Sequence, residues 1–190
     1  TTAGVAGVQA HVSSHATATP GDTVNARVAM NHAGLKTNIE DVQPGGIVII
    51  NEDEFNGSNN KKCGYPEDYN PLHDEHLNST YTMIGVPMSR LTREALADSD
   101  MGAKAIDRCR NMYALGIVYW LYERPLNSTV RYFEEVFGKK KSKPEIADMN
   151  IRALKAGYYF GETAELFSSR YRVPPASHAP GLYRRISGNE

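Results

Sequence analysis

The chain has 190 residues, of which 41% are apolar, and a formal net charge of −1 at pH 7. This length and apolar content are enough to bury a core, and they exclude a disordered chain. The near-neutral charge argues against a nucleic-acid partner, because phosphate binding depends mainly on cationic side chains. One globular domain is the first expectation.

The two cysteines, Cys63 and Cys109, stand far apart in the chain. They lack the paired spacing that a zinc site, an iron–sulfur cluster or a thioredoxin motif requires, so we expect any electron-transfer cofactor to be held elsewhere. Isolated cysteines of this kind favour a reduced, cytoplasmic protein. The longest apolar stretch, residues 113–122, is too short to span a bilayer, and we expect no membrane partner.

The first fifty residues alternate between strand and helix patterns. Alternating apolar residues predict strands at 5–12 and 25–31. The apolar spacing that begins at His32 predicts a short helix over residues 32–42. Four β-favouring apolar residues at 47–50 follow two glycines and are typical of a buried strand in a parallel sheet.

The middle of the chain interrupts this rhythm. Residues 51–79 are rich in Asn, Gly, Pro and acidic residues without a sustained period, which predicts a long loop that is either functional or disordered. Strand character returns at 80–86 and ends at Pro87, and a short helix is expected from Ser89.

The second half of the chain is predicted to be helical. Apolar residues every three or four positions predict helices over 103–123, 127–138 and 144–167, and we interpret the Met, Tyr and Trp stripe of the first as core. Four prolines within residues 171–185 indicate a linker. Strands that alternate with helices, followed by a helical layer, predict an α/β fold with a Rossmann-like open parallel sheet and flanking helices.

The candidate site lies where the predicted strands end, because ligands of open α/β sheets bind beyond the carboxyl ends of the strands. The residues at these ends are candidates for a rim that faces a ligand or a partner: Asn31, His32, Asn51, Glu52, Asp53, Pro87, Met88 and Ser89. The acids Glu52 and Asp53 admit two interpretations, catalytic carboxylates or the solvated edge of a sheet, and the second is the commoner role.

No catalytic residue is predicted within the chain. A dinucleotide-binding fold carries G-x-G-x-x-G directly after its first strand, and this sequence has no such stretch. No serine lies in a nucleophile elbow, and no paired cysteine and histidine indicate covalent catalysis. His73 and His76 flank two acids, but they lack a third ligand on a rigid element, so no metal site is predicted.

Several segments, in a fixed order, resemble one enzyme family. They are "TTAGVAGVQAHV", "TPGD", "VAMNHAGLKTNIEDVQPGGIVIINEDEF", "YNPL", "YTMIGVPMSRLTREAL", "RNMYALG", "ADMNIRALKAGYYFGETAE" and "YRRISGNE". Together they are similar to the 2-oxoacid:ferredoxin oxidoreductases. More narrowly, they resemble the α subunit of a 2-oxoglutarate:ferredoxin (acceptor) oxidoreductase, in which a γ-type domain is fused ahead of the pyrimidine-binding domain.

The resemblance implies an enzyme that oxidatively decarboxylates a 2-oxoacid, with 2-oxoglutarate as the preferred substrate, to an acyl-CoA and CO2 and reduces ferredoxin. It implies that thiamine diphosphate, Mg2+ and a [4Fe–4S] cluster are held by partner domains or subunits, with coenzyme A as co-substrate and no cofactor in this chain. The γ-type domain would have a structural role and help enclose the coenzyme A side. The implied partners are a thiamine-binding β subunit, the remainder of the α subunit and ferredoxin.

The resemblance also implies a domain division, with a γ-type domain at residues 1–170 and a Pro-rich linker towards a pyrimidine-binding domain at 171–190. Domains of this type begin with a strand, a glycine-rich turn and a helix, so we expect the sheet to lack its first βα unit. Two alternatives stay open. One is a stand-alone nucleotide- or flavin-binding Rossmann module, and the other is a structural interaction domain that docks through the 103–123 helix.

Overall fold

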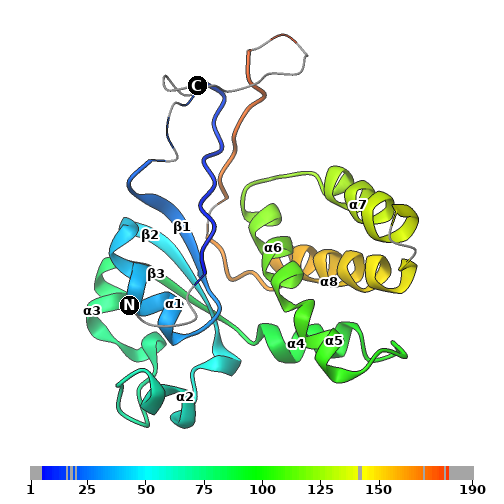
Figure 1. Ribbon diagram of the computed structural model, residues 1–190. Helices are drawn as coiled ribbons and strands as arrows, with labels where there is room; N and C mark the ends of the chain where they lie inside the picture. The colour runs from blue at the N-terminus through cyan, green and yellow to red at the C-terminus, as the bar shows by residue number, and fades with distance from the viewer. Residues whose placement is uncertain are drawn as a thin grey trace, which may run out of the picture.

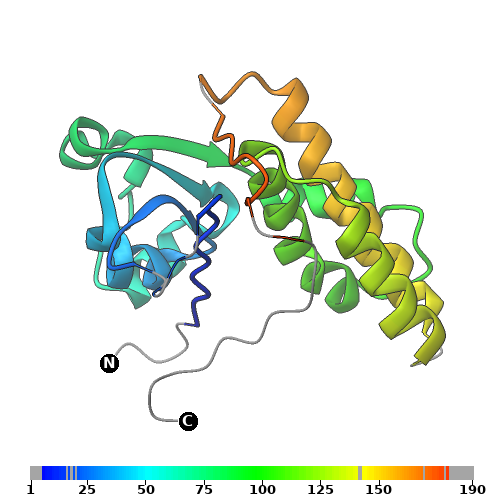
Figure 2. The ribbon, with the colours of Figure 1, turned by 90° about the horizontal axis from the view of Figure 1, so that it is seen from above.

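A computed structural model of the chain describes residues 6–179, with the exception of residues 16, 18, 20, 141, 142, 169 and 178. Within this part, a β-sheet with its own helices forms one half of the molecule and a group of helices forms the other (Figure 1). The view from above shows the same two halves beside each other (Figure 2). The chain therefore completes the sheet before it builds the helical half.

The sheet described has three parallel strands in the order β1-β2-β3. They are β1 (Val24–Ala29), β2 (Val42–Asn51) and β3 (Thr82–Val86). Val28 of β1 lies opposite Ile49 of β2, and Ile49 in turn lies opposite Ile84 of β3. Crossovers that contain helices join consecutive strands, as parallel pairing requires. The predicted α/β fold with an open parallel sheet and flanking helices is confirmed.

Helices occupy both crossovers and the second half of the described chain. The α-helices are α1 (His32–Asn38), α2 (Gly57–Lys62), α3 (Glu75–Thr80), α4 (Met88–Ala95), α5 (Ala103–Arg108), α6 (Arg110–Leu121), α7 (Asn127–Phe133) and α8 (Pro144–Thr163). Short 3-10 turns form η1 (Ile39–Asp41), η2 (Glu52–Glu54) and η3 (Pro71–His73), and η4 (Glu134–Lys140) is a π-helix that continues α7.

The central strand β2 is buried on both faces, because side chains alternate along a strand and helices cover each side of the sheet. Ile49 belongs to a cluster that includes Ile117 of α6. Ile50, its neighbour, belongs to a second cluster that includes Leu35 of α1. Burial on both faces is the reason that this strand reads as an unbroken apolar run.

The helical half is held together by close packing of α6 on α8 (Figure 1). A side chain added at Gly116 would collide with the backbone of α8, and one added at Gly157 would collide with the carbonyl of Tyr113 in α6. The two backbones therefore approach each other more closely than side chains would allow. A third apolar cluster, with Leu96 and Met149, joins the end of α4 to α8.

Three expectations from the sequence were wrong in detail. The strand expected at 5–12 has neither strand nor helix over residues 6–12, where Val8 is 99% exposed. A strand needs a neighbour for its backbone groups, and none of the three described strands pairs with this segment. The single helix expected over 103–123 is divided at Cys109 into α5 and α6, because the amide of Cys109 donates to Ile106 and tightens the last turn of α5.

The third difference concerns residues 51–79, which are not an irregular loop. They form η2, α2, η3 and α3, each too short to show a hydrophobic period. Side chains of Asn56, Asn70 and Asp74 accept hydrogen bonds from backbone amides at the starts of α2, η3 and α3, respectively. These caps explain why the segment is rich in Asn and Asp without being disordered.

Among the described residues, no helix combines the length and the apolar character that a membrane crossing requires.

Candidate functional site

The ends of β2 and β3 are joined by hydrogen bonds at the start of α4. The Asn51 side-chain amide donates to Ser89 Oγ at 3.0 Å, and the Ser89 backbone amide donates to Asn51 Oδ1 at 3.3 Å. The Arg90 backbone amide donates to Asp53 Oδ2 at 2.8 Å. Asn51 and Asp53 therefore supply acceptors to the first turn of α4, whose amides have no partner within the helix.

The residue at the start of α4 cannot supply these acceptors itself. Pro87 occupies the N-cap position and makes no side-chain hydrogen bond there. Asn51 is fully buried and Ser89 is 4% exposed, so their pair would be costly to break. Met88, which is also buried, accepts a hydrogen bond at its carbonyl from the Thr92 hydroxyl.

The acid Glu52 lies beside a small cavity at the same edge of the sheet. The cavity has a volume of about 230 Å³ and is lined by Ile50, Glu52, Phe55, Asn70 and Leu72. A side chain added at Gly85 would collide with the Glu52 carboxylate and with Leu72. Glycine at this position of β3 therefore lets both side chains lie directly over the strand.

A further acid, Glu54, connects the site to the helical half. Its carboxylate pairs with the Arg110 guanidinium at 2.7 Å, and both side chains are partly buried. This ion pair joins η2 to the start of α6. Neither residue was predicted as part of the site, because the two lie 56 positions apart and belong to no local motif.

The end of β1 contributes one surface residue and one buried residue. Asn31 is exposed, and its Oδ1 caps α1 by accepting the Gly34 amide at 2.8 Å. His32 turns inward, is 1% exposed and lies with its ring centroid 4.1 Å from that of Phe55. Neighbouring residues at this strand end therefore have different surroundings.

The eight candidate rim residues divide by exposure. Asn31, Glu52 and Asp53 are exposed and Pro87 is half-buried, whereas His32, Asn51, Met88 and Ser89 are buried. The structure brings Asn51, Asp53 and Ser89 together. The hydrogen bonds recorded for these three residues are those of a helix cap, which supports the interpretation of the acids as the edge of a sheet.

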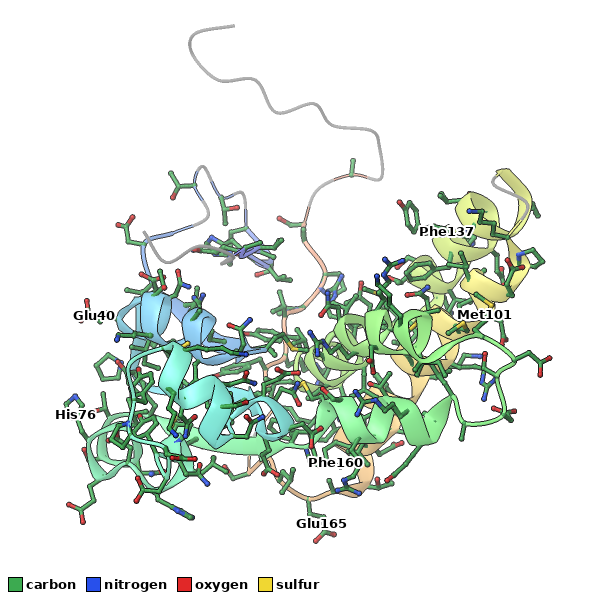
Figure 3. All side chains as sticks on the ribbon, turned by 60° about the horizontal axis from the view of Figure 1, so that its bottom comes forward. Glu40, His76, Met101, Phe137, Phe160 and Glu165 are labelled. Atoms are coloured by element: carbon green, nitrogen blue, oxygen red, sulfur yellow. The ribbon has the colours of Figure 1, made fainter. Side chains whose placement is uncertain are left out.

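The acidic and histidine-rich stretch at 73–76 is organised by hydrogen bonds to Asp74. Asp74 Oδ1 accepts the Leu77 amide at 3.1 Å, and Asp74 Oδ2 accepts the Tyr69 hydroxyl at 2.9 Å. Burial acts to raise the pKa of Asp74, but these hydrogen bonds outweigh it and hold the pKa below its ordinary value. His76 is exposed at the periphery of the sheet half (Figure 3). Among the described residues, no three His, Cys, Asp or Glu side chains are grouped so as to hold a metal ion.

Burial argues against Cys109 as a nucleophile. Cys109 is buried at the junction of α5 and α6, and burial raises the pKa of its thiol. A raised pKa keeps the thiol protonated, whereas the thiolate is the nucleophile. Cys63 is a half-buried free cysteine at the end of α2.

Helix α6 presents its large aromatic side chains to the core. Tyr113 is 2% exposed and Trp120 is 8% exposed, and both belong to the cluster that includes Ile49 of β2. The interpretation of this stripe as core is confirmed. The alternative in which Tyr113 and Trp120 dock a partner is wrong, because neither side chain is accessible.

Comparison with known proteins adds three observations. The family described as Pyruvate ferredoxin/flavodoxin oxidoreductase matches residues 3–160. The 2-oxoglutarate oxidoreductase subunit KorA of Mycobacterium tuberculosis (strain ATCC 25618 / H37Rv) is 43% identical over 186 residues, which are 98% of this chain and 28% of KorA. This chain thus spans little more than a quarter of that relative.

A solved structure shares the fold. It is a 2-oxoglutarate:ferredoxin oxidoreductase from Magnetococcus marinus with 2-oxoglutarate, coenzyme A and succinyl-CoA bound. The TM-score is 0.60 at 21% sequence identity, over 86% of this chain and 24% of that one. The family match covers most of the residues on which the sheet and its helices are built, and the chain therefore belongs to the pyruvate ferredoxin/flavodoxin oxidoreductase family.

Proposed function

We propose that the chain is part of a 2-oxoacid:ferredoxin oxidoreductase that acts on 2-oxoglutarate. In the proposed reaction, 2-oxoglutarate and coenzyme A yield succinyl-CoA and CO2, and the two electrons released reduce ferredoxin. The observation that carries this proposal is the 43% identity to a 2-oxoglutarate oxidoreductase subunit over almost the whole chain. The enzyme is proposed to be cytoplasmic, in agreement with two cysteines that are both free thiols.

The redox and thiamine groups of such an enzyme do not fit the residues of this domain. A [4Fe–4S] cluster needs four thiolates, and the sequence contains two cysteines in all. Cys63 ends α2 and Cys109 lies between α5 and α6, on separate elements. A Mg2+ ion for thiamine diphosphate needs several oxygen ligands, and the described acids form no such group. We therefore assign these groups to partner domains or subunits.

For the domain itself we propose a structural role at the coenzyme A side of the assembly. The exposed strand-end residues Asn31, Glu52 and Asp53 would form part of the enclosure. Two of them are held in place by helix caps, and Asp53 is further supported through the buried pair of Asn51 and Ser89 beside it. In this proposal residues 1–170 form the γ-type domain and residues 171–190 lead towards the pyrimidine-binding domain.

The activity is tested on the complete α subunit co-purified with its β subunit. Reduction of ferredoxin or a viologen dye is measured with either 2-oxoglutarate or pyruvate, with and without coenzyme A. We expect reduction that requires both 2-oxoglutarate and coenzyme A, with much slower turnover of pyruvate. A preference for pyruvate, or no 2-oxoacid-dependent reduction, would contradict the proposal.

The role of the strand ends is tested separately by hydrogen–deuterium exchange on the same complex, with and without coenzyme A. We expect coenzyme A to slow exchange at residues 31–32, 51–54 and 87–91. The helix α7, at the far side of the helical half, serves as the internal reference (Figure 1). If the strand ends and α7 respond alike, the domain does not enclose coenzyme A and its role is confined to packing.

A further inference from the structure

Two buried polar side chains, His32 and Asn60, have atoms without hydrogen-bond partners. Each side chain belongs to a residue that is 1% exposed. Neither ring nitrogen of His32 has a partner, and Asn60 Oδ1 has none either. Unpaired buried polar atoms are few in native proteins, because each costs the free energy of its lost hydration. A pair of them in one region therefore requires an explanation.

The two side chains come from different parts of the chain. His32 begins α1, directly after β1, whereas Asn60 lies on α2 in the second crossover. The Asn60 amide group donates to the carbonyls of Glu67 at 2.9 Å and Tyr69 at 2.8 Å. Asn60 thus organises the segment that follows it, and its remaining oxygen is available to α1.

Aromatic rings surround the imidazole. The His32 ring centroid lies 4.1 Å from Phe55, 5.2 Å from Tyr65 and 6.3 Å from Tyr69. Tyr65 and Tyr69 stack on each other at 4.4 Å. All three rings belong to residues 55–69, so His32 is one of the residues by which α1 meets this segment.

Among the described residues, no carboxylate is paired with the His32 ring. On α1, the Lys36 ammonium lies 5.0 Å from the Tyr65 centroid and donates to the Cys63 carbonyl. On the facing segment are the Tyr65 and Tyr69 phenols. Of the acids in that segment, Asp74 accepts the Tyr69 hydroxyl and Glu67 pairs with Lys61 at 2.6 Å. A proton added to His32 would therefore place a second positive charge near Lys36, in a site shielded from water.

The neutral imidazole complements Asn60. It carries one N–H donor, and Asn60 Oδ1 is an acceptor without a partner. Burial lowers the pKa of His32 below its ordinary value of 6.5, and the Asn60 side chain opposes this shift by its polar contact with the ring. Neither ring nitrogen of His32 nor Asn60 Oδ1 is engaged by another group, so each is free to meet the other.

We propose that His32 and Asn60 form a pH-sensitive clasp, in which the neutral imidazole of α1 donates to Asn60 Oδ1 and holds residues 52–80 closed against the sheet. Protonation of His32 adds a second N–H that has no acceptor, and the clasp opens so that the ring gains water. The acidic strand end at Glu52 and Asp53 begins this same segment, so opening loosens the candidate site. The proposal does not depend on which 2-oxoacid the enzyme uses.

The direction of the pH effect follows from the lowered pKa. Between the pKa of the closed form and 6.5, the open form binds a proton that the closed form does not. The free energy that favours the closed form is therefore largest above pH 6.5 and decreases as the pH falls below that value. One proton taken up on opening changes the equilibrium by up to about tenfold per pH unit in this range.

The test is amide hydrogen exchange on the complete enzyme between pH 5 and 8, corrected for the intrinsic pH dependence of exchange. We expect the open fraction of residues 52–80 to increase below pH 6.5, while α6 and α8 keep their protection. The variant His32→Gln keeps an N–H donor without the titration, so its open fraction should not change with pH. His76→Gln, which removes an exposed histidine of the same segment, is the matched control and should behave as the wild type.

A second measurement does not need a substituted protein. The imidazole nitrogen shifts of His32, followed by NMR in the isotopically labelled enzyme between pH 5 and 8, should give a pKa below 6.5 for this ring. A His32 pKa at or above 6.5 would overturn the proposal. It would also be overturned if α6 and α8 opened with the same pH dependence as residues 52–80, because the effect would then be global unfolding.

Discussion

At the scale of single residues, the acidic end of β2 shows how one short stretch can serve two elements. Asn51 completes a buried strand and Asp53 lies in the turn η2 that follows, and both accept hydrogen bonds from amides of α4. The first turn of a helix has four amides without internal partners. Here acceptors come from the neighbouring strand because Pro87 has no side-chain acceptor to offer.

The Asn51–Ser89 pair should therefore matter for stability. In Asn51→Ala, the Ser89 amide and hydroxyl lose their partner in a site without water, which is expected to cost about 1–3 kcal/mol of unfolding free energy. Urea unfolding followed by circular dichroism measures this loss. Glu52→Gln, an exposed neighbour, is the control and should change stability by less than about 0.5 kcal/mol. Equal effects of the two substitutions would show that the pair contributes nothing specific.

The sequence predicts where these residues lie along the strand, but it does not predict their partners. That Asn51, Glu52 and Asp53 lie at a strand end follows from the apolar run before them. That Asn51 pairs with Ser89, 38 positions later, depends on how β3 lies beside β2, and no local pattern encodes it. The inward turn of His32 was likewise not predicted, since its aromatic neighbours come from a segment without a readable period.

At the scale of elements, the packing of α6 on α8 depends on glycine. Gly116 of α6 and Gly157 of α8 each lie against the backbone of the other helix. Glycine inside a helix is unfavourable by roughly 0.5–1 kcal/mol relative to alanine, so its presence in both helices is compensated by the close contact.

Gly157→Ala should therefore destabilise the protein although alanine favours helix. The added methyl group would collide with the Tyr113 carbonyl, and overpacking of this kind typically costs about 1–3 kcal/mol. Gly138→Ala is the matched control, because no atom lies within 4 Å of the position where its methyl group would be. The midpoint of thermal unfolding should fall for Gly157→Ala. For Gly138→Ala it should rise or stay unchanged. A Gly157→Ala protein as stable as the wild type would contradict the close contact.

Elements whose burial shows in their own sequence were predicted best. Helix α8 and the strand β2 carry their burial in the spacing of their own residues, so their existence was readable. The break at Cys109 and the four short elements within 52–80 depend on single capping residues and on tertiary contacts. The strand pattern at 5–12 lacks a described neighbour to pair with, which shows that alternation alone does not form a strand.

At the scale of the whole molecule, the sheet and the helical half share one apolar core. The largest cluster contains Ile49 and Ile84 of the sheet together with Ile117 and Trp120 of α6. The chain beyond α8 adds a further connection, since the Tyr171 amide donates to the Leu121 carbonyl and its hydroxyl donates to the carbonyl of Asn25. Neither half can lose its packing without exposing apolar surface of the other.

The two halves should therefore unfold in a single transition, which the sole tryptophan can report. Trp120 lies on α6 in the apolar cluster that α6 shares with the sheet, with the Arg170 guanidinium 4.6 Å from the centroid of its ring. Its fluorescence should change at the same urea concentration as the far-ultraviolet circular dichroism, which reports all helices.

A substitution in the sheet tests this coupling directly. Ile49→Ala removes buried methyl groups from β2, and a loss of about 2–5 kcal/mol is expected from the lost burial and the cavity that it leaves. Because the core is shared, the fluorescence of Trp120 and the circular dichroism should both shift to lower urea concentration by the same amount. If the circular dichroism developed two steps while the Trp120 transition stayed in place, the two halves would unfold independently and the shared core would not couple them.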